Sequence, residues 1–309
     1  GRITGMDFTE TLAQPGVLGI LTAADLPGVN DVSPNGKNDD PIFAEGVVQF
    51  WGQPVFAVIA ETRDQARRAA HKARIDYDVL PHALDPIAAR DAGMGYVTDP
   101  LTLKRGDAPA AMVAAPRRIE GRFAIGGQDH FYLEGQIAMA VPGEDDEVLV
   151  HCSTQHPSEV QHIVAHVLNV PANAVAVEVR RMGGAFGGKE TQANLFAATA
   201  AVVARKTGRA AKLRPDRDDD MVITGKRHDF EVDYRVGFDD DGRIRGVEFL
   251  FAARCGFAAD LSGPVTDRAL FHADNAYFYP AVRLRSKPMK TNTVSNTAYR
   301  GFGGPQGLI

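Results

Sequence analysis

The chain has 309 residues, of which 44% are hydrophobic and 24% charged, and its formal net charge is −5. This composition is ordinary for a soluble globular protein with room for two domains, and it gives no reason to expect a nucleic-acid partner. Because no apolar run approaches the roughly 18 residues of a membrane span and no signal-peptide pattern is present, we expect a cytoplasmic protein without membrane contact.

The first part of the chain, residues 1–85, is predicted to form a small α/β domain. Three strands are predicted, at residues 17–22, 55–60 and 75–80. Thr62 and Gln65 have the spacing of a capping box, which predicts a helix through about Ala73. Residues 86–117 are rich in Pro, Asp, Gly and Ala and are predicted as a linker.

The second domain is predicted to span residues 118–309. Its polar segment GGQDHFYLEGQ, residues 126–136, is interpreted as a strand with a satisfied polar cluster. A strand at 148–152 then leads to Gln155, and a helix with one apolar stripe follows. The stripe consists of Val160, Ile163, Val164, Val167 and Leu168. Gln155 therefore stands at a strand-to-helix junction, where functional side chains are common.

A glycine-rich loop is predicted at residues 183–188, after a strand at 175–182. From Lys189 onward the pattern turns helical, with one apolar face formed by Leu195, Ala198 and Val202. A loop of this kind can bring bare backbone N–H groups close to an anion, and the start of a helix adds a positive dipole end. A tight structural turn without a ligand is the competing interpretation.

The same stretch matches the G-x-x-x-x-G-K spacing of a nucleotide-binding P-loop through Gly183, Gly188 and Lys189. A P-loop requires Ser or Thr at the next position, because that hydroxyl holds magnesium. Glu190 stands there instead, and its carboxylate would repel the phosphates. A nucleotide site is therefore disfavoured.

Three other groups of residues are of types that bind metals, but their number or spacing does not favour a metal site. The histidines 156, 162 and 166 lack a third ligand of convincing spacing, so surface positions are favoured. Cys152 and Cys255 are too few for an iron–sulfur cluster and are expected to be buried thiols. The acidic run at residues 216–220 is interpreted as a solvated turn rather than a magnesium site.

The last third of the chain contains a hairpin and a second glycine-rich loop. Alternation over residues 230–236 and 244–251, with turn residues between them, predicts two antiparallel strands. The sequence SNTAYRGFGGPQG, residues 295–307, repeats the glycine-rich character of the first loop. Two such loops suggest a long anionic cofactor that is held from two sides.

Five motifs in this order carry a family resemblance. They are GGQDHFYLEGQ, STQHPSE, GGAFGGKE, DRALFHADN and SNTAYRGFGGPQG. Together they resemble the molybdenum-binding subunit of the xanthine dehydrogenases, within the molybdenum hydroxylase family. The resemblance covers nearly the whole chain and implies an α+β fold. A small hammerhead-like domain would be followed by the first part of a molybdopterin-binding domain.

The resemblance also implies a function and site residues. The cofactor would be molybdenum held by a pyranopterin dithiolene, without a protein ligand on the metal, and the reaction would be hydroxylation of hypoxanthine and xanthine toward urate. The residues implied to contact the cofactor are Gln155, Phe186, Gly187 and Arg300. Glu190 and Arg268 would be the catalytic pair facing the purine, and Phe302 would pack against the substrate ring.

Several alternatives remain at this stage. Aldehyde oxidase-type hydroxylases generally have apolar residues where this chain has Glu190 and Arg268. These two residues could also form an ion pair without a ligand, and the chain could be an inactive scaffold or a nucleotide-binding domain.

The resemblance finally implies partners and a larger protein. Iron–sulfur clusters and FAD are expected on other domains or chains, beside the remaining half of the molybdenum subunit, in an oligomer. Because the family's general base does not occur in the part of the subunit that the chain resembles, we expect an inactive fragment that begins and ends within structure.

Overall fold

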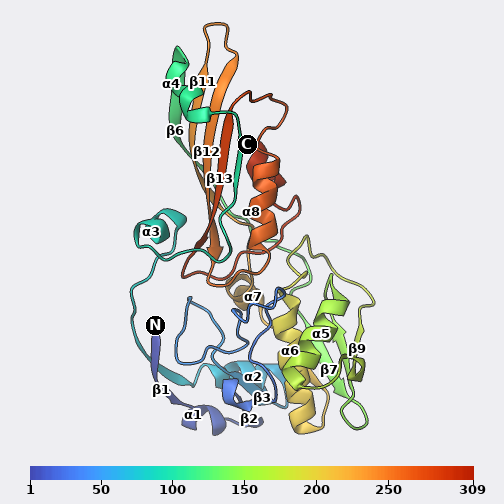
Figure 1. Ribbon diagram of the computed structural model, residues 1–309. Helices are drawn as coiled ribbons and strands as arrows, with labels where there is room; N and C mark the ends of the chain where they lie inside the picture. The colour runs from blue at the N-terminus through green and yellow to red at the C-terminus, as the bar shows by residue number, and fades with distance from the viewer. The chain divides into compact units, whose positions relative to one another are not determined.

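The computed structural model describes all 309 residues, which divide into two compact units (Figure 1). Unit 1 comprises Gly1–Pro81 and Phe131–Gly225, and unit 2 comprises His82–His130 and Lys226–Ile309. Both units combine sheets with helices, which confirms the predicted α+β class. The predicted domain boundaries at residues 85 and 118 divide the chain differently and stay a prediction.

The first stretch of unit 1 contains two small antiparallel sheets, in which β1 pairs with β4 and β2 with β3. Its elements are β1 (Arg2–Asp7), α1 (Thr9–Leu12), β2 (Val17–Leu21), the 3-10 helix η1 (Ala23–Asp25), β3 (Ala57–Ala60), α2 (Arg63–Ala70) and β4 (Arg74–Asp78). The predicted capping box is present: the Gln65 amide donates to Thr62 Oγ1 at 3.3 Å, and the Thr62 amide donates to Gln65 Oε1 at 3.0 Å. The three predicted strands and the capped helix are therefore confirmed.

The second stretch of unit 1 builds a four-stranded sheet in the order β10-β7-β8-β9. Its elements are β7 (Ala138–Pro142), β8 (Val148–Cys152), α5 (Pro157–Leu168), η2 (Ala172–Ala174), β9 (Val175–Glu178), α6 (Ala193–Thr207), β10 (Ala211–Leu213) and α7 (Arg217–Ile223). Helices α5 and α6 pack against each other, and α6 also packs on β7 and β8 (Figure 1). Their apolar faces form the core of the unit, with Val150, Val164 and Phe196 buried, because an amphipathic helix is stable only when its apolar stripe is covered.

The interpretation of residues 216–220 as a solvated turn is wrong, because they lie in α7 and Asp220 is buried. Asp220 Oδ1 accepts a 2.6 Å hydrogen bond from Tyr132 Oη, and Oδ2 accepts a 2.7 Å bond from the Gln136 amide. A run of charges normally faces solvent, but a carboxylate can be buried when donors satisfy its oxygens. Those donors lie more than 80 residues away in sequence, so the local charge pattern could not reveal them.

Unit 2 is built on a five-stranded sheet in the order β5-β13-β12-β11-β6. Its elements are α3 (Pro86–Asp91), β5 (Thr102–Arg105), α4 (Ala108–Ala114), β6 (Arg117–Ile125), β11 (Phe230–Phe238), β12 (Ile244–Gly256), α8 (Ser262–Phe271), β13 (Val282–Lys290) and α9 (Gly304–Leu308). The predicted hairpin is confirmed, since β11 and β12 pair antiparallel from Phe230 opposite Ala253 to Phe238 opposite Ile244. Helix α8 packs against β13 and β12 (Figure 1).

The segment 86–117, predicted as a linker, contains α3, β5 and α4. Asp85 and Asp107 are the N-caps of the two helices, and each cap is followed by Pro at one of the first two helical positions. Helix α4 lies close to the hairpin, where a Cβ added to Gly237 would be 2.8 Å from the Cβ of Ala115. The Pro and Asp residues here therefore mark the starts of helices rather than a flexible connection.

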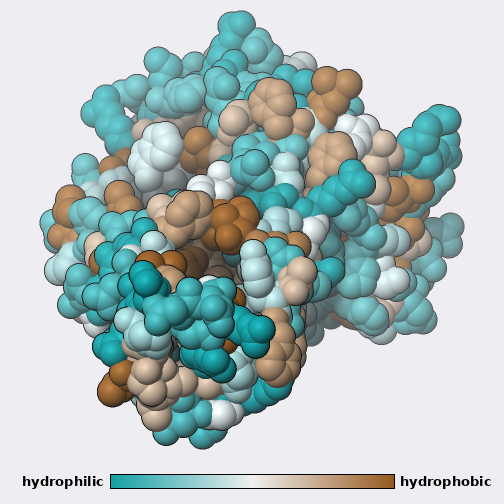
Figure 2. Space-filling view, turned by 90° about the horizontal axis from the view of Figure 1, so that it is seen from above, coloured by the Kyte–Doolittle hydropathy of each residue, from teal (hydrophilic) through white to brown (hydrophobic).

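The surface is mainly hydrophilic on the face shown in Figure 2, with hydrophobic residues exposed singly or in small groups. The most exposed large hydrophobic side chains of the whole chain include Leu133 and Trp51, at 92% and 84%. Single exposed hydrophobic residues are normal for a globular protein. None of the helices has both the length and the apolar character that spanning a membrane requires.

Candidate functional site

Gln155 holds the first glycine-rich loop at the end of β8. Its side-chain oxygen Oε1 accepts the backbone N–H of Gly187 at 2.8 Å and that of Lys189 at 3.4 Å. Its own backbone N–H donates to Lys189 O at 2.8 Å. Since two N–H donors face Oε1, the amide orientation is defined, and Nε2 is left as a donor on the exposed side chain.

The loop itself has an unusual backbone. Phe186 has φ +57° and Gly187 φ +101°, so a bulky residue occupies the left-handed region directly before a glycine that needs it. Such geometry persists only where the surroundings enforce it, and it is common at ligand sites. The loop does not open the helix directly as predicted, because α6 begins at Ala193 and residues 189–192 intervene. This spacing departs further from a P-loop.

Residues 126–136, predicted as a strand, are irregular. The last part of this segment forms hydrogen bonds with the first glycine-rich loop. The Gly183 amide donates to Glu134 Oε2 at 2.7 Å, and the Glu134 amide donates to Gly183 O at 3.1 Å. Gln136 Nε2 donates to Gly188 O at 2.8 Å. These polar groups are satisfied by the glycine-rich loop rather than by a sheet ladder, which explains the absence of a strand.

Glu190 follows this loop and is partly buried beside a paired histidine. Desolvation raises the pKa of its carboxyl group, His156 opposes that rise, and Glu159 adds to it. His156 Nδ1 lies 3.2 Å from Glu159 Oε2, and Asn194 Nδ2 donates to Glu159 Oε1 at 2.8 Å. Glu190 therefore holds a proton more readily than an exposed carboxyl group and can exchange one with a ligand.

In unit 2, Arg268 lies on α8 next to the second glycine-rich loop. Its Nε is 3.3 Å from His272 Nε2, one helical turn away. A Cβ added to Gly304 would lie 3.8 Å from that same Nε, so the loop passes close to the guanidinium group. The Arg268 side chain is exposed, and its charge is available to a ligand.

The second loop repeats the backbone of the first. Gly301, Phe302 and Gly303 have φ values of +99°, +50° and +90°, so a left-handed phenylalanine again stands directly before a glycine at positive φ. A Cβ on Gly303 would lie 2.0 Å from Val265 O, which means that only glycine permits this approach to α8. The predicted likeness of the two loops thus extends to their backbone geometry.

A stack of side chains fixes the irregular segment that contains Tyr299 and Arg300. The guanidinium carbon of Arg227 lies 3.9 Å from the ring centroid of Tyr299, whose other stacking partner is His130 at 4.7 Å between centroids. Arg227 Nη2 donates to Arg300 O at 2.8 Å. The backbone of Arg300 is therefore held, while its side chain is exposed.

The predicted site residues fall into two groups, one in each unit. The group in unit 1 consists of Gln155, Phe186, Gly187 and Glu190. The group in unit 2 consists of Arg268, Arg300 and Phe302. Sequence reasoning missed three residues that support the first group, namely Lys189, Asp220 and Gln136, all of which are buried. The only available signals were the polar types of Lys189 and Gln136 inside segments rich in Gly and aromatic residues, and the place of Asp220 in an acidic run.

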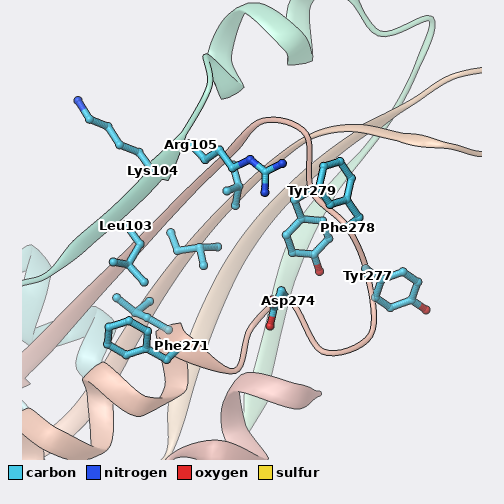
Figure 3. Close-up of a pocket in the computed structure, with 11 residues that line it drawn as sticks. Leu103, Lys104, Arg105, Phe271, Asp274, Tyr277, Phe278 and Tyr279 are labelled. Carbon is cyan, nitrogen blue, oxygen red and sulfur yellow. The ribbon is translucent and has the colours of Figure 1, made fainter.

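Unit 2 also contains a cavity of about 280 Å³ between β5, α8 and the segment before β13 (Figure 3). Its walls include Leu103, Arg105, Phe271 and the aromatic run 277–279. The guanidinium group of Arg105 lies over the ring of Phe278 at 4.4 Å. None of the predicted site residues lines this cavity, so it is separate from the second glycine-rich loop.

The predicted site residues offer hydrogen-bond donors rather than a cluster of metal ligands. No group of three or more His, Cys, Asp or Glu side chains is placed to hold a metal ion. The two loops instead offer backbone at close approach, the Gln155 amide donor and the exposed guanidinium of Arg300. These are hydrogen-bond donors, which suit the oxygen atoms and phosphate of an anionic cofactor.

Comparison with known proteins identifies the domains that the chain carries. Residues 92–309 match the family model of the molybdopterin cofactor-binding domain, and residues 1–81 match the a/b hammerhead domain of aldehyde oxidase and xanthine dehydrogenase. The chain is 41% identical over 309 residues to the xanthine dehydrogenase/oxidase of Gallus gallus, covering 100% of this chain and 22% of that protein. It is also 41% identical over 311 residues to the xanthine dehydrogenase of Oryza sativa subsp. japonica, covering 100% of this chain and 23% of that protein.

The fold leads to the same group of proteins. The aldehyde oxidoreductase of Desulfovibrio gigas superposes with a TM-score of 0.88 at 26% identity, over 99% of this chain and 35% of that one. The chain therefore spans 22% to 35% of the length of these three proteins. With both family models and the fold in agreement, the chain belongs to the aldehyde oxidase and xanthine dehydrogenase family, of which it carries a hammerhead domain and a molybdopterin cofactor-binding domain.

Proposed function

We propose that the protein containing this chain is a molybdenum hydroxylase of the xanthine dehydrogenase type, which converts hypoxanthine and xanthine toward urate. The observation that carries the proposal is the Gln155 amide fixed on a left-handed glycine loop that also presents Glu190. The identity of 41% over the whole chain to xanthine dehydrogenases supports the purine substrate. The activity belongs to the whole protein. This chain supplies part of its cofactor site and part of its substrate site.

Toward the cofactor, the role of this chain's residues is to bind the cofactor and to orient it. When bound, the molybdenum–pterin cofactor supplies the redox chemistry and the oxygen transfer. Gln155 Nε2 donates a hydrogen bond to an oxygen of the cofactor, because its Oε1 is already held by Gly187. The loop at Phe186 and Gly187 lets the backbone approach closely, and Arg300 contributes a cationic donor from unit 2.

On the substrate side, Glu190 and Arg268 recognise and activate the purine. The raised pKa of Glu190 lets its carboxyl group hold or return a proton at a ring nitrogen. The Arg268 guanidinium stabilises negative charge as it develops on the heterocycle, which is the role of an oxyanion hole. Phe302 packs against the face of the ring.

Electrons must leave through other parts of the protein. Both cysteines of this chain are buried, and burial raises the pKa of each thiol to about 12, so neither is available as a cluster ligand. Iron–sulfur and FAD domains or subunits, together with the rest of the molybdenum subunit, are the proposed partners within an oligomer. A cytoplasmic location accords with free thiols.

The test is made on the complete protein that contains this chain. Molybdenum and pterin content should be stoichiometric, and xanthine should be oxidised with an artificial electron acceptor. Stoichiometric cofactor without purine turnover would refute the substrate assignment, and the absence of molybdenum would refute the cofactor role in this protein.

A second candidate is an aldehyde oxidase-type hydroxylase, which the superposition on the aldehyde oxidoreductase of Desulfovibrio gigas favours. A kcat/KM for aromatic aldehydes well above that for purines would select it. A nucleotide-binding role is disfavoured by Glu190 and by the start of α6 at Ala193. An increase in melting temperature on addition of ATP would restore that role.

A further inference from the structure

Lys189 is a lysine whose whole side chain is buried, with 0% exposure, directly after the first glycine-rich loop. Burying an ammonium group without partners is costly, so its surroundings must compensate. Its Nζ donates to Ser153 Oγ at 2.8 Å, lies 3.9 Å from Glu134 Oε1 and sits 4.8 Å from the ring centroid of Tyr132. Of these three partners, Ser153 follows β8, whereas Tyr132 and Glu134 belong to the irregular segment 126–136.

The backbone of the same residue is bonded as well. Lys189 O accepts from the Gln155 amide at 2.8 Å and from Thr154 Oγ1 at 3.1 Å, while Lys189 N faces Gln155 Oε1 at 3.4 Å. Side chain and backbone therefore tie one residue to three consecutive positions after β8. Glu190 is the next residue in the chain, so its position is set by the same anchor.

We propose that Lys189 is the positioning residue that fixes the Gln155 amide and the Glu190 carboxyl group relative to each other. This role rests on the function proposed above for those two residues. The ammonium group touches neither substrate nor cofactor, because Ser153, Glu134 and Tyr132 enclose it. It acts through the loop, by joining β8, the glycine-rich turn and the segment 132–134 into one rigid support.

The positive charge of the Lys189 ammonium group distinguishes a positioning role from simple packing in the core. A buried ion pair is often no better for stability than a well-packed apolar side chain. Desolvation lowers the pKa of Lys189, and the nearby carboxyl group of Glu134 opposes that change. Because the Glu134 side chain is 38% exposed and can be hydrated without its partner, a lysine kept only for stability could be replaced by methionine at modest cost. A lysine kept for geometry could not, because the hydrogen bond to Ser153 Oγ is directional.

The test compares Lys189→Met with Lys206→Met in the complete protein. Lys206 makes the matched control, since it lies on α6 and pairs with Asp25 at the surface. The first readout is hydrogen exchange of the peptides that cover residues 153–156 and 183–192. We expect Lys189→Met to speed exchange in these peptides and to leave the rest of the chain unchanged, whereas Lys206→Met should leave both peptides at the wild-type rate.

The second readout is purine turnover per bound molybdenum. Loss of a residue that orients a ligating or catalytic group typically costs 10- to 100-fold, and we expect a fall of this order in kcat per molybdenum. Ser153→Ala should cause a similar fall, and the double variant should be no worse than either single one, because both changes break one interaction.

Three outcomes would overturn the proposal. One is wild-type exchange in both peptides or, at the other extreme, a general rise in exchange throughout unit 1, which would indicate a purely structural lysine. Another is unchanged turnover per molybdenum, and the third is additive losses in the double variant. If the wild-type protein binds no molybdenum, the function proposed above fails, and the exchange data still decide whether Lys189 orders the loop.

Discussion

At the residue scale, the site depends on a few positions where the backbone is held in conformations that ordinary residues avoid. Both glycine-rich loops place a phenylalanine at positive φ beside a glycine at positive φ. A left-handed bulky residue costs on the order of 1–3 kcal/mol, so the surrounding hydrogen bonds must enforce it. In the first loop that enforcement comes from Gln155 Oε1, which binds Gly187 N.

Gly187→Val should lower the molybdenum content of the complete protein without unfolding it. A valine resists φ +101°, and its side chain would keep the loop backbone away from the cofactor. Gly19→Val is the control, since Gly19 lies in β2 at ordinary φ with no atom within 4 Å of an added Cβ. Metal analysis beside circular dichroism checks this. Normal molybdenum with normal turnover would mean that the loop is only a turn.

Arg268→Met should reduce kcat for xanthine by on the order of 10²-fold, as is usual when a donor to developing charge is lost. Aldehydes need less stabilisation of ring charge and should be affected less. Arg245→Met, which removes an exposed partner of Asp239, serves as the control. Steady-state kinetics on both substrate classes measures the effect, and unchanged xanthine turnover would contradict the assignment of Arg268.

At the element scale, local capping decides where the helices begin. The capping box of Thr62 and Gln65 could be predicted from spacing alone, because all of its atoms lie within one turn of helix. The start of α6 could not be predicted in this way. Its first expected turn, from Lys189, is diverted by the bonds of Lys189 to Gln155 and Ser153, which lie more than 30 residues earlier.

Thr62→Ala should lower the free energy of unfolding by about 1 kcal/mol, the usual value of an N-cap. Chemical denaturation of the chain measures it. Ser158→Ala, at an exposed position in the first turn of α5, should change stability by much less. Equal losses in the two variants would show that the capping box adds nothing beyond a general serine or threonine effect.

The buried His228 should make stability depend on pH. Desolvation, aided by Arg254, lowers its pKa from 6.5 to about 3, while its Nε2 stays 2.8 Å from Ser262 Oγ. The unfolded state therefore binds this proton more readily, so stability is fully present above about pH 6.5 and is lost as pH falls toward 3.

His228→Gln should flatten this part of the pH profile. The slope attributable to His228 is at most about 1.4 kcal/mol per pH unit, and glutamine can keep a hydrogen bond to Ser262 without titrating. Urea unfolding of wild type and variant at pH 7 and pH 5 gives the comparison. An equal acid loss in both would mean that other groups cause it.

At the scale of the whole molecule, we propose that the chain carries parts of a site rather than a complete enzyme. It spans 22% of the Gallus gallus relative and contains only two cysteines, both buried. We expect the isolated chain to fold, because each unit has its own core, but to bind little molybdenum and to show no xanthine turnover. Metal analysis and an assay with an artificial acceptor check this. Stoichiometric molybdenum together with turnover would contradict it.

The sequence by itself determined the family, the α+β class, the hairpin, the capped helix and the amphipathic α5. The elements depend on neighbours within one turn or one strand pair, and the family resemblance depends on short motifs in the chain itself. The composition of residues 86–117 did not reveal the two helices and the strand in that segment, because Pro and Asp mark helix starts as well as loops.

Only the tertiary structure decided the environment of the polar residues. It placed Asp220 and Lys189 in the interior, with partners that lie 30 to 90 residues away in sequence. A charged side chain is stable there only when such partners are present, and nothing in the local pattern announces them. The candidate site residues could therefore be predicted from motifs, whereas the buried residues that contact them, such as Lys189, could not.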